Sequence, residues 1–153
     1  MTIQILTKKE RKEILEKLED QYGIEKIQGI LILVGKERIF LYQGNMNGEE
    51  IRNLEQTICI ERIGTYIAKI QEDKIRLSIE GSQILKDSIT KNIFDLNEEQ
   101  ATEWMMGREL GISSGKIDYL IMRYKNDFLG TGKASQNKIT NFIPKNRRLK
   151  EKS

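Results

Sequence analysis

Short apolar segments separated by glycine- and asparagine-marked turns constrain the fold of this chain more than any other feature. They cover residues 27–34, 38–42, 57–60, 64–70, 74–79 and 92–96, and a hairpin follows from Ile117 with its turn at Lys125-Asn126-Asp127. Isoleucine-rich or alternating segments of this length are typical of β-strands. The pattern predicts small curved sheets or barrels.

Two capping boxes mark where the longer helices begin. Thr7 with Glu10, and Asn97 with Gln100, have the spacing at which each residue can cap the backbone of the other. Glycines at 23 and 107 suit the ends of these helices. Two shorter helices are also expected, one that ends at Leu54 and one that begins near Ser82. Strands and helices mixed in this way predict the α+β class, with a small N-terminal α/β domain ahead of a β-rich domain.

A new set of strands begins near residues 72–74, which predicts a domain boundary there. The two predicted domains are then residues 1–72 and 73–153. No low-complexity linker separates them, and one compact body would give a similar pattern.

The absence of histidine and the presence of one cysteine, Cys59, restrict the available chemistry. The chain lacks the usual general base near neutral pH and the commonest metal ligand, and it cannot build an ordinary structural zinc site. We therefore expect no metal, no cofactor and no enzymatic activity. An enzyme that uses carboxylates or Cys59 stays open as an alternative.

The same composition indicates a cytoplasmic protein without a membrane segment. No run of 18 apolar residues is present, and the N-terminal residues are too charged for a signal peptide. A single cysteine fits a reducing compartment.

Basic residues gather at the C-terminal end. Residues 133–153 contain seven lysines and arginines against one glutamate, a net charge of +6 in a chain whose total is +3. The rest of the chain therefore carries −3, and this asymmetry is typical of a phosphate-binding end. A solvated basic tail is the alternative.

The segment Gly130-Thr131-Gly132-Lys133 contains the glycines and lysine typical of a nucleotide-binding loop, but the residues around it do not match the motif of such a loop. A P-loop needs a glycine where Asp127 stands and a serine or threonine where Ala134 stands. Glycines in a strand instead indicate a sharp bend or a bulge. We expect this segment to shape a small barrel.

Three C-terminal segments carry a resemblance to a known family. LNEEQATEWMMGREL, YLIMRYKNDFLGTGK and ITNFIPKNRRL, in this order, resemble the PUA-like RNA-binding domain at the C-terminus of Sun-type rRNA 5-methylcytosine methyltransferases. The resemblance covers roughly residues 90–149. The matching positions are Gly130, Gly132 and Lys133 in the glycine-lysine turn, then Asn141, Pro144, Lys145 and Arg148 in the closing motif.

The resemblance implies that residues 73–153 form a PUA-like β-pseudobarrel with short helices. The order of the two domains is similar to that of ribosome-biogenesis factors in which a small α/β domain precedes a PUA domain. The catalytic domain of the methyltransferases has two cysteines and a glycine-rich cofactor loop, whereas this chain has Cys59 alone and no such loop. The resemblance thus implies the RNA-binding part without its catalyst.

The resulting functional hypothesis is recognition of structured rRNA or tRNA in RNA modification or ribosome biogenesis. The expected RNA-binding residues are Lys133, Lys138, Asn141, Lys145, Arg147 and Arg148. Their cations would hold phosphates, while Asn141 or a hairpin tyrosine (Tyr119 or Tyr124) would touch a base or a 2′-hydroxyl. The alternative is a protein-interaction module that serves a separate RNA methyltransferase or a ribosome-assembly complex.

Overall fold

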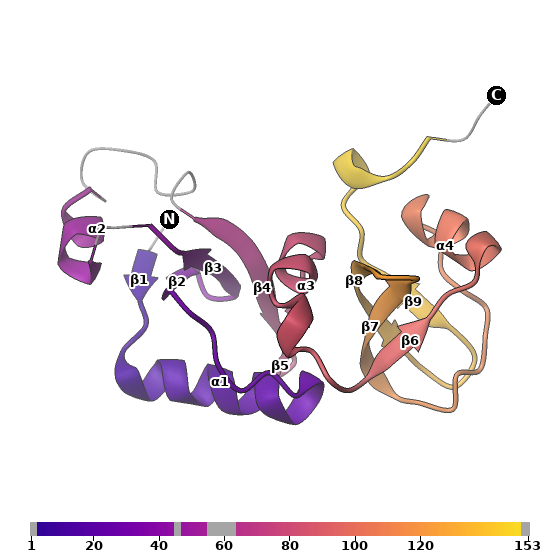
Figure 1. Cartoon of the computed structure of the whole chain (residues 1–153), viewed down its shortest axis with the longest axis horizontal. Coiled ribbons are helices and arrows are strands. Elements are labelled where there is room, and N and C mark those ends of the chain that lie inside the picture. The colour runs from indigo at the N-terminus through magenta and orange to yellow at the C-terminus, as the bar shows by residue number, and fades with distance from the viewer. Residues whose placement is uncertain (1–2, 45–46, 55–63, 151–153) are drawn as a thin grey trace.

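The computed structural model describes residues 3–44, 47–54 and 64–150 of the chain, which form two sheets side by side (Figure 1). The predicted strand over residues 57–60, with Cys59, lies outside the described residues. Helices and strands are mixed throughout, so the α+β prediction is confirmed. No helix in the described ranges is both long and apolar enough to cross a membrane.

The first sheet has five antiparallel strands in the order β1-β2-β3-β4-β5. The strands are β1 (Ile3–Ile5), β2 (Ile30–Val34), β3 (Arg38–Tyr42), β4 (Thr65–Gln71) and β5 (Lys74–Leu77). In β5 the apolar positions Ile75 and Leu77 are buried and alternate with polar residues, as predicted. The strand is shorter than predicted, because it ends at Leu77 and Ile79 begins the next helix.

Helix α1 (Lys8–Tyr22) covers one face of this sheet (Figure 1). Its start is the predicted capping box: the Glu10 amide donates to the Thr7 hydroxyl at 3.2 Å, and the Thr7 amide donates to the Glu10 carboxylate at 3.0 Å. Its end is also as predicted, because Gly23 adopts the left-handed conformation with φ 77°. Leu18 and Tyr22, one helical turn apart, are fully buried against the sheet.

The opposite face of β1, β2 and β3 contacts α2 (Gly48–Leu54). Ile51 of α2 is buried in a small apolar cluster with Ile32, Val34 and Phe40. The first sheet is thus covered on both faces.

The second sheet has the strand order β6-β7-β8-β9, with one parallel pair, β6 and β7. Its strands are β6 (Ile93–Asp95), β7 (Asp118–Tyr124), β8 (Asp127–Ala134) and β9 (Ile139–Asn141). Helix α4 (Glu98–Met105) begins at the predicted Asn97–Gln100 capping box and places the fully buried Trp104 in the core of this sheet.

Strand β8 contains the bulge that its glycines predict. Ile121 pairs with Thr131 but Arg123 pairs with Phe128, so β8 has one extra residue at this point, and Gly130 has φ 81°. The Gly130 amide donates at 3.1 Å to the buried hydroxyl of Ser82, which belongs to α3 (Ile79–Ile84). A helix outside the sheet therefore fixes the bulge.

The two sheets contact each other extensively. Helix α3 lies between β4 and β8 (Figure 1), and the apolar residues Tyr119, Ile121 and Phe128 of the second sheet join the core cluster built by α1 and the first sheet.

The predicted boundary after residue 72 falls in the tight turn that connects β4 to β5, two strands of the same sheet. Two ion pairs link this turn to the second sheet: Glu72 to Lys133 at 3.0 Å, and Lys74 to Asp118 at 3.1 Å. The two-domain division at this residue stays a prediction.

Candidate nucleic-acid interface

The closing segment of the chain combines a buried anchor with an exposed basic turn. Ile143 is 4% exposed in the core of the second sheet, and Pro144 follows in an extended conformation with ψ 148°. A 3-10 helix of one turn, η3 (Lys145–Arg147), comes next, and its side chains are exposed. The apolar residue thus fixes the place at which the cations emerge.

Asn141 ties this segment to the end of α4. Its side-chain amide donates to the carbonyls of Trp104 (2.8 Å) and Arg108 (2.9 Å), and its oxygen accepts from the Ile143 amide at 2.8 Å. Carbonyls at a helix C-terminus lack partners within the helix, and Asn141 supplies one from another strand. A base contact by Asn141 stays a prediction; both of its N–H donors are in use, whereas its oxygen can accept one more hydrogen bond.

Arg148 also fastens the segment to α4. Its Nε donates to the Ile143 carbonyl at 2.9 Å, and its side chain packs directly on Gly107, where a Cβ would collide with it. The next amide, of Leu149, donates to the Met105 carbonyl at 2.8 Å. Two positions of the closing motif, Asn141 and Arg148, therefore hold the basic turn in place.

Three of the remaining predicted cations face carboxylates on three different elements. Lys133 contacts Glu72 at 3.0 Å, Lys138 contacts Glu109 at 3.2 Å, and Arg147 pairs with Glu80 of α3. The hydrogen bond that Lys133 donates to the Glu72 carboxylate raises the pKa of Lys133, so this lysine stays charged. All these side chains are at least one-third exposed, and exposed pairs contribute little to stability. These ion pairs therefore cost little free energy to break.

Lys145 differs from these three. Within the described ranges its ammonium group has no ion pair or hydrogen bond, and the side chain is exposed. The structure thus places Lys145, Arg147 and Arg148 together on one turn, while Lys133 and Lys138 point to separate neighbours.

The hairpin tyrosines are less available than the sequence suggests. Tyr119 is 4% exposed and packs beside Phe142, with 6.2 Å between ring centroids. Stacking of a base on Tyr119 is therefore ruled out in this conformation. Tyr124 is half-buried, and the Lys125 ammonium lies 5.3 Å from its ring centroid. The large aromatic residues Tyr22 and Trp104 are fully buried in the core.

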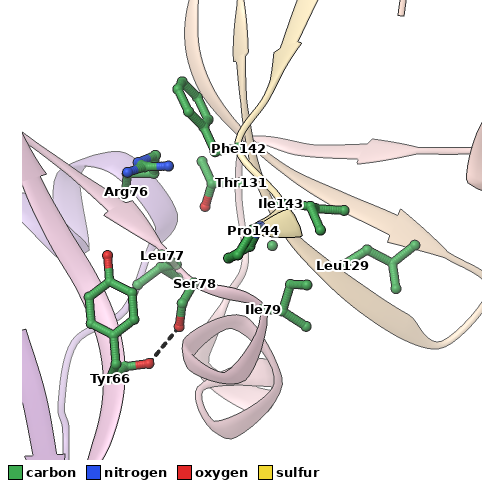
Figure 2. A pocket seen from close by; sticks show the side chains of 11 residues that line it. Tyr66, Arg76, Leu77, Ser78, Ile79, Leu129, Thr131, Phe142, Ile143 and Pro144 are labelled. Carbon is green, nitrogen blue, oxygen red and sulfur yellow. Dashed lines mark hydrogen bonds between the residues drawn. The ribbon is translucent and has the colours of Figure 1, made fainter. Parts of the chain in front are cut away.

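A group that the sequence did not single out lies between the two sheets. Arg76 of β5 extends across the interface, and its guanidinium carbon is 4.2 Å from the centroid of the Phe142 ring (Figure 2). Beside this contact is a hollow of about 100 Å³, lined from one side by Tyr66 and Arg76 and from the other by Thr131, Phe142 and Pro144. The alternation in β5 indicated only that Arg76 leaves the first core. The alternation did not indicate that the second sheet lies opposite the Arg76 side chain.

A comparison with known protein families supports the resemblance of the C-terminal half. Residues 91–149 match the family model described as the RsmF methyltransferase PUA domain. The resemblance to the PUA-like domain of rRNA methyltransferases is therefore confirmed.

Among proteins of known activity, the chain is similar to Ribosomal RNA small subunit methyltransferase F of several bacteria. It is 27% identical over 139 residues to that of Vibrio cholerae, which covers 90% of this chain and 28% of the relative. The relative from Vibrio parahaemolyticus is 25% identical over 146 residues, covering 91% and 29%. That from Aliivibrio fischeri is 32% identical over 84 residues, covering 55% and 18%.

The chain thus spans less than a third of the length of these relatives. In the first two, the similarity extends well beyond the PUA-like domain, because it covers about nine-tenths of this chain. The first sheet is therefore part of what the chain shares with them.

Proposed function

We propose that this chain binds structured RNA and acts in rRNA modification. The observation that carries this proposal is the match of residues 91–149 to the RsmF-type PUA domain, in which the closing motif bears the basic turn. The relatives are named for methylation of small-subunit ribosomal RNA, so rRNA is the first RNA to test.

Recognition would rest on phosphate contacts from a pre-positioned turn. Ile143, Asn141 and Arg148 fix the backbone around η3, so that Lys145 and Arg147 reach solvent from a rigid base. Arginine offers a planar fork of donors to phosphate, whereas lysine offers a mobile charge. Such contacts set position and affinity without reading sequence.

The carboxylates that face Lys133, Lys138 and Arg147 would act as competitors for phosphate. Each ion pair is exposed, so exchange of a carboxylate for a phosphate keeps the cation neutralised. Binding should therefore depend on salt concentration, since each phosphate contact releases a condensed counterion.

We further propose that the chain contributes no catalysis of its own and acts in the cytoplasm. We also propose that its main partner is rRNA, in preference to tRNA or a ribosome-assembly partner. Incubation of the purified chain with rRNA and a labelled methyl donor tests the first point. Transfer of label to the RNA would show an enzyme.

The direct test is a binding titration of the purified chain against rRNA fragments, total tRNA and duplex DNA over a series of salt concentrations. We expect tighter, salt-sensitive binding to structured RNA than to DNA. Absence of binding to all three at low salt would contradict the proposal and favour the alternative of a protein-interaction module. Capture of an RNA methyltransferase by the immobilised chain would then be the next measurement.

A further inference from the structure

The hollow between the two sheets has the composition of a small binding pocket. Its volume is about 100 Å³, well below the roughly 300–1,000 Å³ of sites for drug-sized ligands and cofactors. Most of its wall is apolar, including Leu77 and Ile79 from one side and Leu129 and Pro144 from the other (Figure 2). It suits one small, flat and largely apolar group.

Polar groups without partners surround this apolar wall. Thr131 lines the hollow and is 4% exposed, yet its hydroxyl has no hydrogen bond among the described residues. The Tyr22 hydroxyl donates to the Ile75 carbonyl at 2.5 Å. Burial raises the pKa of Tyr22 and the nearby Thr131 hydroxyl partly offsets this rise, but the two hydroxyls do not meet in hydrogen-bond geometry. A buried hydroxyl without a partner costs about 1–3 kcal/mol, and such a group in a native protein calls for an explanation.

Arg76 is the second such group. Its Nε is buried without a hydrogen-bond partner, and no carboxylate pairs with its guanidinium in the described part of the chain. Its guanidinium lies over the face of the Phe142 ring. The hollow thus presents a planar cation and a hydroxyl, both able to donate, in an otherwise apolar space.

An RNA base fits this combination better than a phosphate does. A phosphate is strongly hydrated, and apolar walls would remove that hydration with few donors to replace it. A base has apolar faces and an edge with hydrogen-bond acceptors, and unstacked bases are commonly held by stacking together with arginine or hydroxyl contacts. Arginine in particular recognises an acceptor-bearing edge with two parallel hydrogen bonds.

Cations lie on both sides of the hollow, where the neighbouring phosphates of a strand would run. On the first sheet, Tyr66 and Arg76 also line a second hollow of about 500 Å³, together with the cationic side chains of Lys36, Arg38 and Lys69. Glu37 lines it as well and pairs with Lys69 at 3.5 Å, so the region keeps an excess of cations. On the other side, Pro144 leads directly into Lys145 and Arg147 of η3. The hollow therefore sits between two basic regions.

We propose that the hollow between the sheets takes one unpaired RNA base, with the acceptor-bearing edge of the base toward Arg76 and Thr131. This inference rests on the proposed RNA binding and deepens it: the first sheet contributes directly to recognition, and a single unpaired nucleotide distinguishes the preferred RNA from a plain duplex.

The test compares five hairpin RNAs: one fully paired stem, and four that carry one additional bulged nucleotide, one for each base. Their affinities for the full chain are measured by fluorescence anisotropy at one salt concentration. We expect at least one bulged hairpin to bind several-fold more tightly than the fully paired stem. Thr131→Val should reduce this preference by about two- to tenfold, the effect of one lost hydrogen bond.

The same substitution separates binding from folding. Because the Thr131 hydroxyl has no partner in the free protein, Thr131→Val should leave the urea midpoint unchanged or raise it. Thr102→Val, on the exposed side of α4, makes the same chemical change away from the hollow and should leave the preference intact. Arg76→Lys keeps the charge but loses the planar fork, so it should lower the preference for the bulge without changing affinity for the paired stem.

Each result decides the inference. Equal affinity of the wild-type chain for bulged and paired hairpins, with salt-sensitive binding to both, overturns the base pocket and leaves the proposed function standing. An unchanged preference in both Thr131→Val and Arg76→Lys overturns it as well. Failure of the wild-type chain to bind any of these hairpins or rRNA fragments overturns the pocket and the proposed function together.

Discussion

The side-chain amide of Asn141 donates to the Trp104 carbonyl at 2.8 Å, and this bond joins the last strand of the second sheet to the end of helix α4. Trp104 is fully buried, so the bond connects the core of the domain to the segment that carries the basic turn. Asn141 therefore matters for the position of Lys145 and Arg147, whether or not it touches a ligand itself.

Asn141→Ala should destabilise the chain by about 1–3 kcal/mol, because it leaves the carbonyls of Trp104 and Arg108 and the Ile143 amide without this partner. Urea unfolding followed by circular dichroism measures the effect as a lower midpoint at unchanged slope. Asn146→Ala is the matched control: Asn146 is exposed on η3, and its loss should leave the midpoint unchanged. Equal midpoints for the two variants would show that the Asn141 bonds are not structural.

Gly132→Ala should destabilise the second sheet by about 1–3 kcal/mol through overpacking. A Cβ at this position would lie 2.5 Å from Ile139 Cγ2 and 2.7 Å from Trp104 Cη2, well inside van der Waals contact. Gly111→Ala is the control, because nothing lies within 4 Å of its Cβ. It should be neutral or slightly stabilising by the lower entropy of the unfolded chain. The melting temperature of Gly132→Ala should therefore fall, whereas that of Gly111→Ala should stay the same or rise slightly.

Acid should weaken the link between β6 and β7. Arg123 donates to both carboxylate oxygens of Asp95, at 2.6 and 2.9 Å, and this hydrogen bonding holds the pKa of Asp95 below its ordinary value. A lowered pKa in the folded state gives stability that is present above the unfolded pKa of about 3.9 and is lost as pH falls through the folded pKa.

Asp95→Asn should accordingly lower the free energy of unfolding at pH 7 by no more than about 1 kcal/mol, because the pair is exposed, and the melting temperature should fall with it. The difference from wild type should shrink as pH falls from 5 toward 3. A difference that stays constant over this range would mean that the charge of Asp95 contributes nothing.

Removal of a competing carboxylate should strengthen RNA binding. Glu80→Gln frees Arg147 and Glu72→Gln frees Lys133, so each should raise affinity for an rRNA fragment by up to about fivefold at low salt, the scale of an exposed ion pair. Glu13→Gln, an exposed position on α1, controls for the change in net charge. If all three variants gain equally, the gain comes from overall charge and not from the predicted site.

Helix ends and strand alternation could be predicted from the sequence because their causes are local. The Thr7 and Asn97 capping boxes and the Gly23 end depend on residues a few positions apart. Where the cause is distant, prediction was less accurate. The sequence predicts the start of α3 near Ser82, but the helix begins at Ile79, where the Ser78 hydroxyl donates to the Tyr66 carbonyl of β4.

The basic turn could be predicted, but the surroundings of its residues could not. Asn141 and Arg148 belong to a recognisable motif, yet their bonds to α4 depend on how the helix packs against β9. The partners of Lys133 and Arg147 come from 61 and 67 residues earlier in the chain. Arg76 stayed unnoticed for the same reason, because its role depends on the second sheet being placed opposite β5.

The central claim is that the turn after Pro144 holds RNA phosphates, and the most direct test is the salt dependence of binding. The double variant Lys145→Gln, Arg147→Gln removes two cations but keeps Arg148, which has a structural role. Lys9→Gln, Lys12→Gln on the exposed side of α1 removes the same charge elsewhere.

For the double variant on the turn, the slope of log K against log salt concentration should become shallower by roughly 1.4–1.8, the release of two counterions, and affinity should fall. The α1 variant should keep the wild-type slope. Identical slopes for all three proteins, each folded as judged by circular dichroism, would contradict the account and remove the basic turn from the RNA-binding surface.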